Sequence, residues 1–186
     1  MSFPVIRTDR LLMRPFAAAD IREAWSYRGL EEVTTWTGAW LSSYEQWEQR
    51  ATSILDSMLA IERDGRLVGD LKFARQDGWG QAGSDPAAVR GAEVEIGWTI
   101  DPAHAGRGYA TEAARALIAH AFGTPSVRRV VAYAFADNAP SIRIMRKLGM
   151  REEARTREDS FHATRGWIDG VAYAMLRSEW EATRAV

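Results

Sequence analysis

Two glycines that flank an arginine give the clearest chemical signal in the sequence. They lie in the stretch HAGRGYAT, residues 104–111, which follows an apolar segment and precedes a long alanine-rich one. Gly106 and Gly108 carry no side chains, so a ligand can approach the backbone closely. If a helix begins here, its free N–H groups and its dipole suit a pyrophosphate, and Arg107 can add a charge-assisted hydrogen bond. The plainer alternative is a flexible loop with a glycine at the start of a helix.

Two well-known phosphate-binding loops do not match this stretch. A Walker loop ends in Gly-Lys-Ser or Gly-Lys-Thr, whereas Gly108 is followed by Tyr109 and Ala110. The Rossmann pattern requires a third glycine or alanine, and Thr111 stands at that position. The stretch therefore predicts a backbone cradle of another kind.

The hydrophobic pattern predicts the elements that would position this loop. Asp64-Gly65 between apolar flanks indicates a hairpin turn, and Pro140 and Gly149 mark the start and the end of a short helix. In chain order we predict a strand at 10–16, helices at 17–29 (capped by Asp20) and 42–58 (opened by Ser42 or Ser43), a hairpin over 59–76, a mobile loop at 77–91, a strand at 92–101, a helix at 111–122, a strand at 128–136, a helix at 138–149 and two final strands around a loop at about 160–166. This order predicts one domain over residues 1–186, of the α/β class, with a mixed, mostly antiparallel sheet, a central βαβ crossover and flanking helices.

Composition excludes several classes of function. The 186 residues include 24 Lys and Arg against 25 Asp and Glu, which gives no overall basic footprint for a nucleic-acid partner. The absence of cysteine excludes disulfides, thiolate metal sites and an acyl-cysteine intermediate. The three histidines share no metal-ligand spacing, so we predict no metal. Because the N-terminal segment lacks the apolar run of a signal peptide and no stretch could span a membrane, we expect a soluble, cytoplasmic protein.

The glycine stretch also resembles motif A of the GNAT acyltransferases, whose pattern is Gln/Arg-x-x-Gly-x-Gly/Ala. Gly108 and Ala110 match this pattern, and Ala105 replaces its Gln or Arg. The segment NAPSIRIMRKLGM, residues 138–150, resembles the family's Asn-x-x-Ser…Lys-x-Gly-Phe signature, with Met150 in place of the aromatic residue. The opening TDRLLMRPFAAAD and the closing GWIDGVAYAMLRSEW resemble the RimJ/RimL branch, so the resemblance covers nearly the whole chain.

The resemblance implies an enzyme that transfers an acetyl group from acetyl-CoA to an amine. It implies that the amides of the glycine loop hold the CoA pyrophosphate, and that the strand end at 98–100 pairs with the pantetheine arm. A backbone N–H there would polarise the thioester carbonyl. The next strand, which carries small Ala132, Ala134 and Ala136 on one face, should separate from it. The implied coenzyme-binding residues are Trp98, Thr99, Ile100, Gly106, Arg107, Gly108, Tyr109, Ala110, Thr111, Asn138, Ser141, Arg143 and Lys147.

Plainer interpretations of several of these residues stay open. The alanine face can pack against a helix instead of a ligand. Asn138 can be a helix N-cap and Ser141 an ordinary residue of the first turn. Arg143 and Lys147 are spaced to meet the adenosine phosphates, but charged residues on a helix usually face water.

The resemblance implies a general base in the strand at 92–101, and Glu95 is the first candidate. It shares a face with Glu93 and Thr99, and both glutamates can instead be solvated residues of an exposed face. Glu158 and Asp159 are secondary candidates. For the proton of the leaving thiolate we expect the Ser141 hydroxyl, because Met145 stands where many relatives have a tyrosine; a thiolate can also leave without a dedicated acid.

The acceptor site should be formed by the first two helices, the loop at 76–91 and the loop at about 160–166. Four tryptophans lie there: Trp25, Trp36, Trp40 and Trp47. Trp36 and Trp40 could contact a peptide, a small amine or a partner subunit of a homodimer, but core packing is the default explanation for most of the four. His162 could line this site, whereas His104 borders the glycine loop and His120 is expected to be structural.

The amine acceptor itself stays open between a protein N-terminus and a small molecule such as an aminoglycoside. Two other functions also stay open. One is a non-catalytic acyl-CoA-binding regulatory module, and the other is a structural domain with a fortuitous glycine loop.

Overall fold

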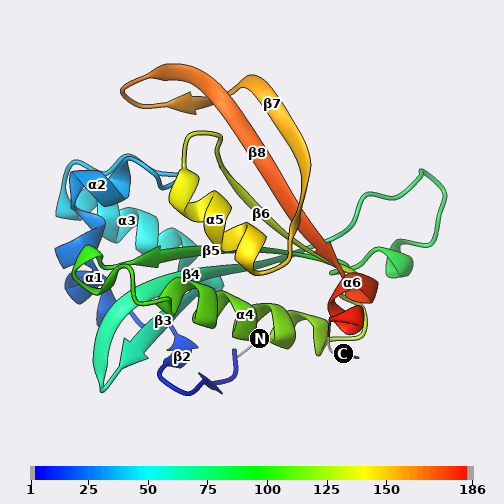
Figure 1. The fold of residues 1–186 in the computed structure, drawn as a ribbon, viewed down its shortest axis with the longest axis horizontal. Helices are drawn as coiled ribbons and strands as arrows, with labels where there is room; N and C mark the ends of the chain where they lie inside the picture. The colour runs from blue at the N-terminus through cyan, green and yellow to red at the C-terminus, as the bar shows by residue number, and fades with distance from the viewer. Residues whose placement is uncertain (1–2, 184–186) are drawn as a thin grey trace.

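An eight-stranded sheet runs through the middle of the protein (Figure 1). The computed structural model describes residues 3–183. In chain order the elements are β1 (Ile6–Arg7), β2 (Leu12–Pro15), α1 (Asp20–Arg28), α2 (Glu31–Thr34), α3 (Tyr44–Ile54), β3 (Met58–Arg63), β4 (Arg66–Gln76), β5 (Glu93–Ile100), α4 (Tyr109–Phe122), β6 (Arg129–Phe135), α5 (Ala139–Lys147), β7 (Arg151–His162), β8 (Gly166–Leu176) and α6 (Arg177–Ala182). The strand order is β1-β2-β3-β4-β5-β6-β8-β7. The β5–β6 pair is parallel and the other described pairs are antiparallel, which confirms the predicted sheet and its crossover.

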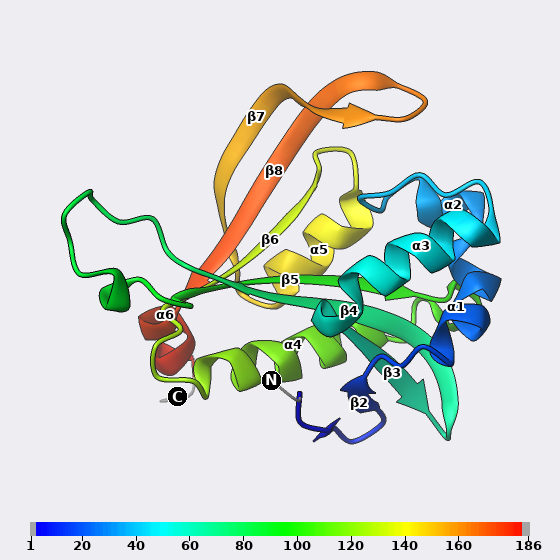
Figure 2. The same cartoon turned by 180° about the vertical axis from the view of Figure 1, so that it is seen from behind.

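Helices cover both faces of this sheet (Figures 1 and 2). Helices α4 and α5 pack on one face, where Leu117 and Met145 are fully buried in the larger core beside Val130 of β6. On the other face, α1 and α3 form a second core around Tyr27 and Trp47. Each helix turns one apolar stripe to the sheet, as an amphipathic helix does. The second core includes Met58 and Ala60 of β3 and Leu67 of β4 but no residue of β5 or β6, so it covers only the first half of the sheet.

Three predictions from short local patterns are confirmed. Asp64 and Gly65 both have positive φ, 51° and 74°, as a two-residue hairpin turn between right-twisted strands requires. Ser43 caps α3, because its side chain accepts a hydrogen bond from the Gln46 N–H. Gly149 follows α5 with φ of 82°, a conformation that ends a helix and favours glycine.

Several predicted boundaries are wrong. Asp20 does not cap α1: it lies in the first turn, where its carboxylate pairs with Arg14 and accepts the Ala17 N–H at 2.7 Å. The second helix ends at Ile54 instead of residue 58, because Met58 already pairs with Lys72 in the sheet. The final two strands extend to His162 and restart at Gly166, which shortens the predicted loop. Three elements were not predicted, β1, α2 and α6, because two, four and six residues carry too little periodicity.

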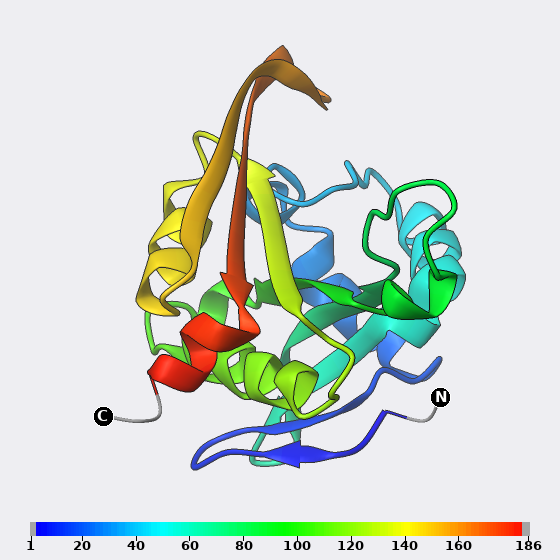
Figure 3. The same cartoon turned by 90° about the vertical axis from the view of Figure 1, so that its right-hand side faces the viewer.

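Two parts of the chain project from the layered body. The hairpin of β7 and β8 rises away from it in Figure 3, and its tip bends toward the region of α2 in Figure 1. The loop at 77–91 projects at the opposite end of the sheet. Within residues 3–183, no helix is both long enough and apolar enough to cross a membrane.

Candidate active site

Strands β5 and β6 separate partway along their length. They are paired from Glu93 to Glu95 of β5, opposite Arg129 to Val131 of β6, and no pair is recorded beyond this point. Strand β5 continues to Ile100 against β4, and β6 continues to Phe135 against β8. The edge of β5 at residues 96–100 is thus left without a strand partner in the described structure. The predicted separation is present, and it leaves backbone groups for an extended ligand to pair with.

Two hollows open on the two sides of this separation. The glycine-loop hollow has a volume of about 550 Å³ and is lined by the glycine loop, the end of β5 and the start of α5. The second, which we call the α3 cleft, has a volume of about 580 Å³ and lies among α3, the sheet and the β7–β8 hairpin. Six residues line both hollows: Trp36, Thr37, Trp98, Thr99, Asn138 and Ser141. A molecule in one hollow can therefore meet a molecule in the other at these residues.

Residues far away in the sequence hold the glycine loop in shape. Gly106 and Gly108 have φ of 74° and 82°, and α4 begins at the next residue. The Arg10 side chain donates from Nη1 to the Arg107 carbonyl at 3.0 Å and from Nε to the Glu112 carboxylate at 2.7 Å. The loop is thus tied to both the turn before β2 and the first turn of α4, a tie that the sequence analysis missed.

Arg107 and Tyr109, which were also predicted to bind the ligand, do not point freely into the glycine-loop hollow. Arg107 is absent from the lining of the hollow, and its guanidinium donates back to the Ala103 carbonyl at 3.3 Å. Tyr109 lines the hollow, but it is 1% exposed, and the guanidinium carbons of Arg10 and Arg63 lie 4.9 and 5.3 Å from the centre of its ring. Ala110 and Thr111 line the hollow beside it.

The rest of the glycine-loop hollow suits a polyanion. Arg143 and Lys147 of α5 line it, and the structure records no ionic partner for either side chain within residues 3–183. His104 also lines it, and its buried Nδ1 has no hydrogen-bond partner in the described part of the chain. The hollow thus combines helix-start amides, two unpaired cations and an unsatisfied imidazole nitrogen, a set that fits the phosphates of coenzyme A.

Asn138 and Ser141 lie where the two hollows meet. Asn138 is 5% exposed, and its Oδ1 accepts the Ser141 N–H at 3.1 Å, so the N-cap interpretation is confirmed. Met145 is fully buried in the core and lines neither hollow. Ala132 also lies in that core, as the helix-packing interpretation of the alanine face requires, although it borders the α3 cleft too.

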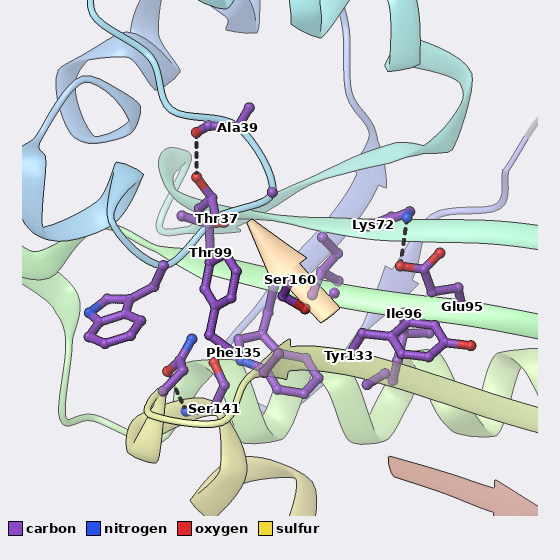
Figure 4. Close-up of a pocket in the computed structure, with 18 of the residues that line it drawn as sticks. Thr37, Ala39, Lys72, Glu95, Ile96, Thr99, Tyr133, Phe135, Ser141 and Ser160 are labelled. Carbon is purple, nitrogen blue, oxygen red and sulfur yellow. Dashed lines mark hydrogen bonds and ion pairs between the residues drawn. The ribbon is translucent and has the colours of Figure 1, made fainter. Parts of the chain in front are cut away.

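The two glutamates of β5 have different surroundings. Glu95 lines the α3 cleft, and the Lys72 ammonium of β4 lies 2.6 Å from its Oε1 (Figure 4). Glu93 lies outside the cleft and pairs with Arg129. Of the secondary candidates, Asp159 lines the cleft and Glu158 does not. Glu95 is therefore the glutamate of β5 that faces the α3 cleft, and it has a cation beside it.

A buried polar network at the base of the cleft was missed by the sequence analysis. Asp70 is 1% exposed; it accepts the Tyr27 hydroxyl at 2.8 Å and the Arg28 Nε at 2.9 Å. Burial, with Asp70 beside it, raises the pKa of Tyr27 well above its usual value. Arg28 also stacks on Trp47, with Cζ 5.1 Å from the ring. The sequence feature that could have indicated this network is the position of Asp70 inside the apolar run LVGDLKF.

His162 does not line either hollow. It is 2% exposed, and its Nε2 lies 3.0 Å from the Thr35 carbonyl oxygen. Its ring packs against those of Phe135 and Trp40, at 5.2 and 6.4 Å between centroids. The tip of the β7–β8 hairpin is thus tied to the loop after α2. Trp36 lines both hollows, as expected for the acceptor side.

Comparison with known proteins gives a family and several relatives. Residues 10–151 match the family model described as "Acetyltransferase (GNAT) domain". "Uncharacterized N-acetyltransferase YnaD" of Bacillus subtilis is 37% identical over 86 residues, which is 46% of this chain and 50% of that protein. "Uncharacterized N-acetyltransferase YoaA" of the same organism is 28% identical over 158 residues, 84% of this chain and 88% of that protein.

Solved structures share the fold. A GNAT-family acetyltransferase from Bacillus anthracis has a TM-score of 0.81 at 26% identity, covering 95% of this chain and 100% of its own. RimL, titled a ribosomal L7/L12 alpha-N-protein acetyltransferase in complex with coenzyme A, has a TM-score of 0.79 at 16% identity, covering 95% of this chain and 99% of its own. Because only 16% of the residues are identical, the similarity to RimL shows that the two proteins share a fold and nothing about the substrate of this chain.

Proposed function

Because this chain belongs to the GNAT acetyltransferase family, we propose that it is an acetyl-CoA-dependent N-acetyltransferase that acts on a primary amine by direct transfer in a ternary complex. One observation carries the proposal: two separate hollows meet at Thr99, Asn138 and Ser141, beside the free edge of β5. A donor held in one hollow and an acceptor held in the other can react there without an enzyme-bound acyl group. The absence of cysteine agrees with this direct route.

The glycine-loop hollow supports the choice of donor. The amides at the start of α4 would hold the pyrophosphate of acetyl-CoA, with Arg143 and Lys147 on its other side. The free edge of β5 at 96–100 would pair with the pantetheine arm as an added strand. RimL, which has the same fold, was solved in complex with coenzyme A. When bound, acetyl-CoA supplies an activated acyl thioester.

Three groups of the chain each carry out one part of the reaction: Glu95, a backbone N–H of β5 and Ser141. Glu95 takes the proton that the amine loses as its nitrogen bonds to the thioester carbonyl carbon. A backbone N–H on the free edge of β5 donates to the carbonyl oxygen as negative charge develops on it. The Ser141 hydroxyl donates a proton to the sulfur as the carbon–sulfur bond breaks, and the proton taken by Glu95 returns to Ser141 through solvent, which restores both side chains. The products are an N-acetylated amine and free CoA.

The finer points of the function belong to the same proposal. We place the chain in the RimJ/RimL-like branch, with a protein N-terminus or a small-molecule amine as acceptor; RimL itself is titled an alpha-N-protein acetyltransferase. The cytoplasmic location and the homodimer stay predictions.

Calorimetric titration of acetyl-CoA into the protein, followed by detection of released CoA thiol with a panel of amines, tests the proposal. We expect saturable binding and release of CoA that depends on the amine. Binding without release from any amine would favour the non-catalytic acyl-CoA-binding regulatory module. No binding to the folded protein would contradict both functions.

A further inference from the structure

One cation in the lining of the α3 cleft has no partner among the described residues 3–183. Six charged residues line the cleft, and four of them form two pairs, Lys72 with Glu95 and Arg28 with Asp70. Arg50 of α3 has no hydrogen bond or ion pair through its side chain within residues 3–183, and Asp159 has no basic partner there. These two unpaired groups are the ones available to a ligand.

Arg50 and Arg28 lie on the same wall of the cleft. Trp47 and Arg50 are three residues apart on α3, so they share a face of that helix, and both line the cleft. Arg28 stacks on the Trp47 ring, and Asp70 holds its Nε and Nη2, which fixes the guanidinium against this wall. Two guanidinium groups and one buried carboxylate give the wall a net positive charge. A guanidinium binds a carboxylate through two parallel hydrogen bonds.

The opposite wall is negative. A bulge in β7, between Thr156 and Ser160, brings Asp159 into the lining of the cleft. The Ser160 hydroxyl donates to Asp159 Oδ1 at 2.9 Å, and hydrogen bonds from Thr156 and Ser160 lower the pKa of Asp159 below its usual value. This carboxylate repels an anion and attracts an ammonium. The two walls together orient a molecule that carries both charges.

A contact between the β7–β8 hairpin and the loop after α2 lies next to residues that line the cleft, Thr37 and Ala39 of the loop and Ser160 of β7. The hairpin tip is tied to the loop after α2 by the contact between His162 and the Thr35 carbonyl, and Trp40 packs on the same imidazole. Asp70, which holds Arg28, lies opposite Thr99, and Lys72, which holds Glu95, lies opposite Gly97, two residues or about 7 Å along β5. A single small molecule can therefore reach from the positive wall toward Glu95 within a cleft of about 580 Å³.

From these observations we infer that the acceptor is a small amine that also carries a carboxylate, as a free amino acid does, and that Arg50, beside Arg28, binds that carboxylate. This inference rests on the proposed function and names the substrate class for the same site. The carboxylate lies on the α3 wall, and the amine points toward Glu95.

The test compares matched acceptors that differ only in the anionic group. CoA release is measured with free amino acids and with their amides, and phosphoethanolamine is compared with ethanolamine to separate a phosphate from a carboxylate. We expect kcat/KM to favour the acid over its amide by about tenfold or more, mainly through KM, as for a charged hydrogen bond. Arg50→Gln should lower this preference by a similar factor. Arg22→Gln is the matched control, because Arg22 stacks on Tyr44 outside the cleft and should leave the preference as it is.

The outcomes separate this inference from the proposed function. CoA release that favours amides, peptides or the phosphate compound over amino acids keeps the enzyme and overturns the carboxylate-bearing acceptor. An acid preference that Arg50→Gln leaves intact overturns the assignment of Arg50. Binding of acetyl-CoA with no release from any acceptor overturns the enzyme and, with it, this inference.

Discussion

The Lys72 ammonium lies 2.6 Å from the Glu95 carboxylate, diagonally across strands β4 and β5 in the floor of the α3 cleft. Lys72 stands opposite Gly97, so no side chain separates it from Glu95 on this face of the sheet. The contact holds the carboxylate at the edge of the region where β5 and β6 separate. A general base in this place must receive its proton next to a fixed positive charge.

Glu95→Gln tests this role. We expect turnover at neutral pH to fall about 100-fold or more, because the amine loses its proton acceptor. Turnover should recover partly at high pH, where the amine, with a pKa of about 8 to 10, is already neutral. The measurement is kcat against pH, and Glu93→Gln, whose carboxylate pairs with Arg129 outside the cleft, is the control. An unchanged rate would leave Glu95 as a partner of Lys72 alone.

Ser141→Ala separates catalysis from helix capping. If the hydroxyl protonates the leaving sulfur, kcat should fall about 100-fold while the stability of the fold is kept. Asn138→Ala should instead lower the free energy of unfolding by about 1 kcal/mol, because Asn138 caps α5. Steady-state kinetics and urea unfolding of both variants make the comparison. Full activity in Ser141→Ala would mean that the thiolate leaves without this acid.

Gly106→Ala tests the backbone cradle. Both Gly106 and Gly166 have φ of 74°, and a Cβ added to either meets no atom within 4 Å. Alanine at either position should therefore cost about 1–2 kcal/mol of conformational strain. Only the Gly106 variant adds a methyl group beside the hollow, so only this variant should lose about tenfold or more in acetyl-CoA affinity by calorimetry. Equal affinities in the two variants would contradict the cradle.

Asp70→Asn tests the buried network at the base of the cleft. Removing the carboxylate leaves the Arg28 charge buried without its partner, so we expect a loss of about 3–5 kcal/mol in the free energy of unfolding. Tyr27→Phe removes one hydrogen bond to the same carboxylate and should cost about 1 kcal/mol. Urea unfolding measures both losses. Similar small losses in the two variants would show that Arg28 finds another partner.

Asp20 should make stability depend on pH. Burial alone would raise the pKa of Asp20, but hydrogen bonds from Arg14 and the Ala17 N–H lower it below its usual value. A carboxyl whose pKa is lowered by folding stabilises the fold above its unfolded-state pKa of about 3.9, and this stabilisation disappears as the pH falls through the folded-state value.

Thermal unfolding of the wild type and of Asp20→Asn, measured from pH 7 to about pH 2, reports how much the Asp20 charge stabilises the fold. The variant should be less stable than the wild type at pH 7, and the two curves should converge below about pH 4. A difference that stays constant from pH 7 to about pH 2 would mean that the charge of Asp20 does not contribute.

Features that depend on neighbours in the chain could be predicted from the sequence. The hairpin turn at Asp64-Gly65 and the Ser43 and Asn138 caps each need only a few consecutive residues. The alternation of apolar residues was enough to place Glu95 on one face of a strand. The glycine stretch indicated a loop before a helix because glycine tolerates positive φ.

Features that depend on distant residues could not be predicted. Tyr27 meets Asp70 across 43 positions, and Arg10 reaches the Arg107 carbonyl across 97. The folding of the Arg107 side chain away from the hollow and the burial of His162 against Thr35 also follow from such contacts. No local pattern in the sequence reports them, because each is made only when separate elements pack.

By itself the sequence determined the order of the elements, the positions of the turns and caps, and the residue types available for chemistry, because these follow from local sterics and from the period of the apolar pattern. Only the tertiary structure decided which charges meet. It paired Lys72 with Glu95, opened the sheet between β5 and β6, and left Arg50 on the wall of the cleft with no side-chain partner within residues 3–183. The physical reason is that register and packing join side chains from strands and helices far apart in the chain, and the period of a single segment carries no information about its partners.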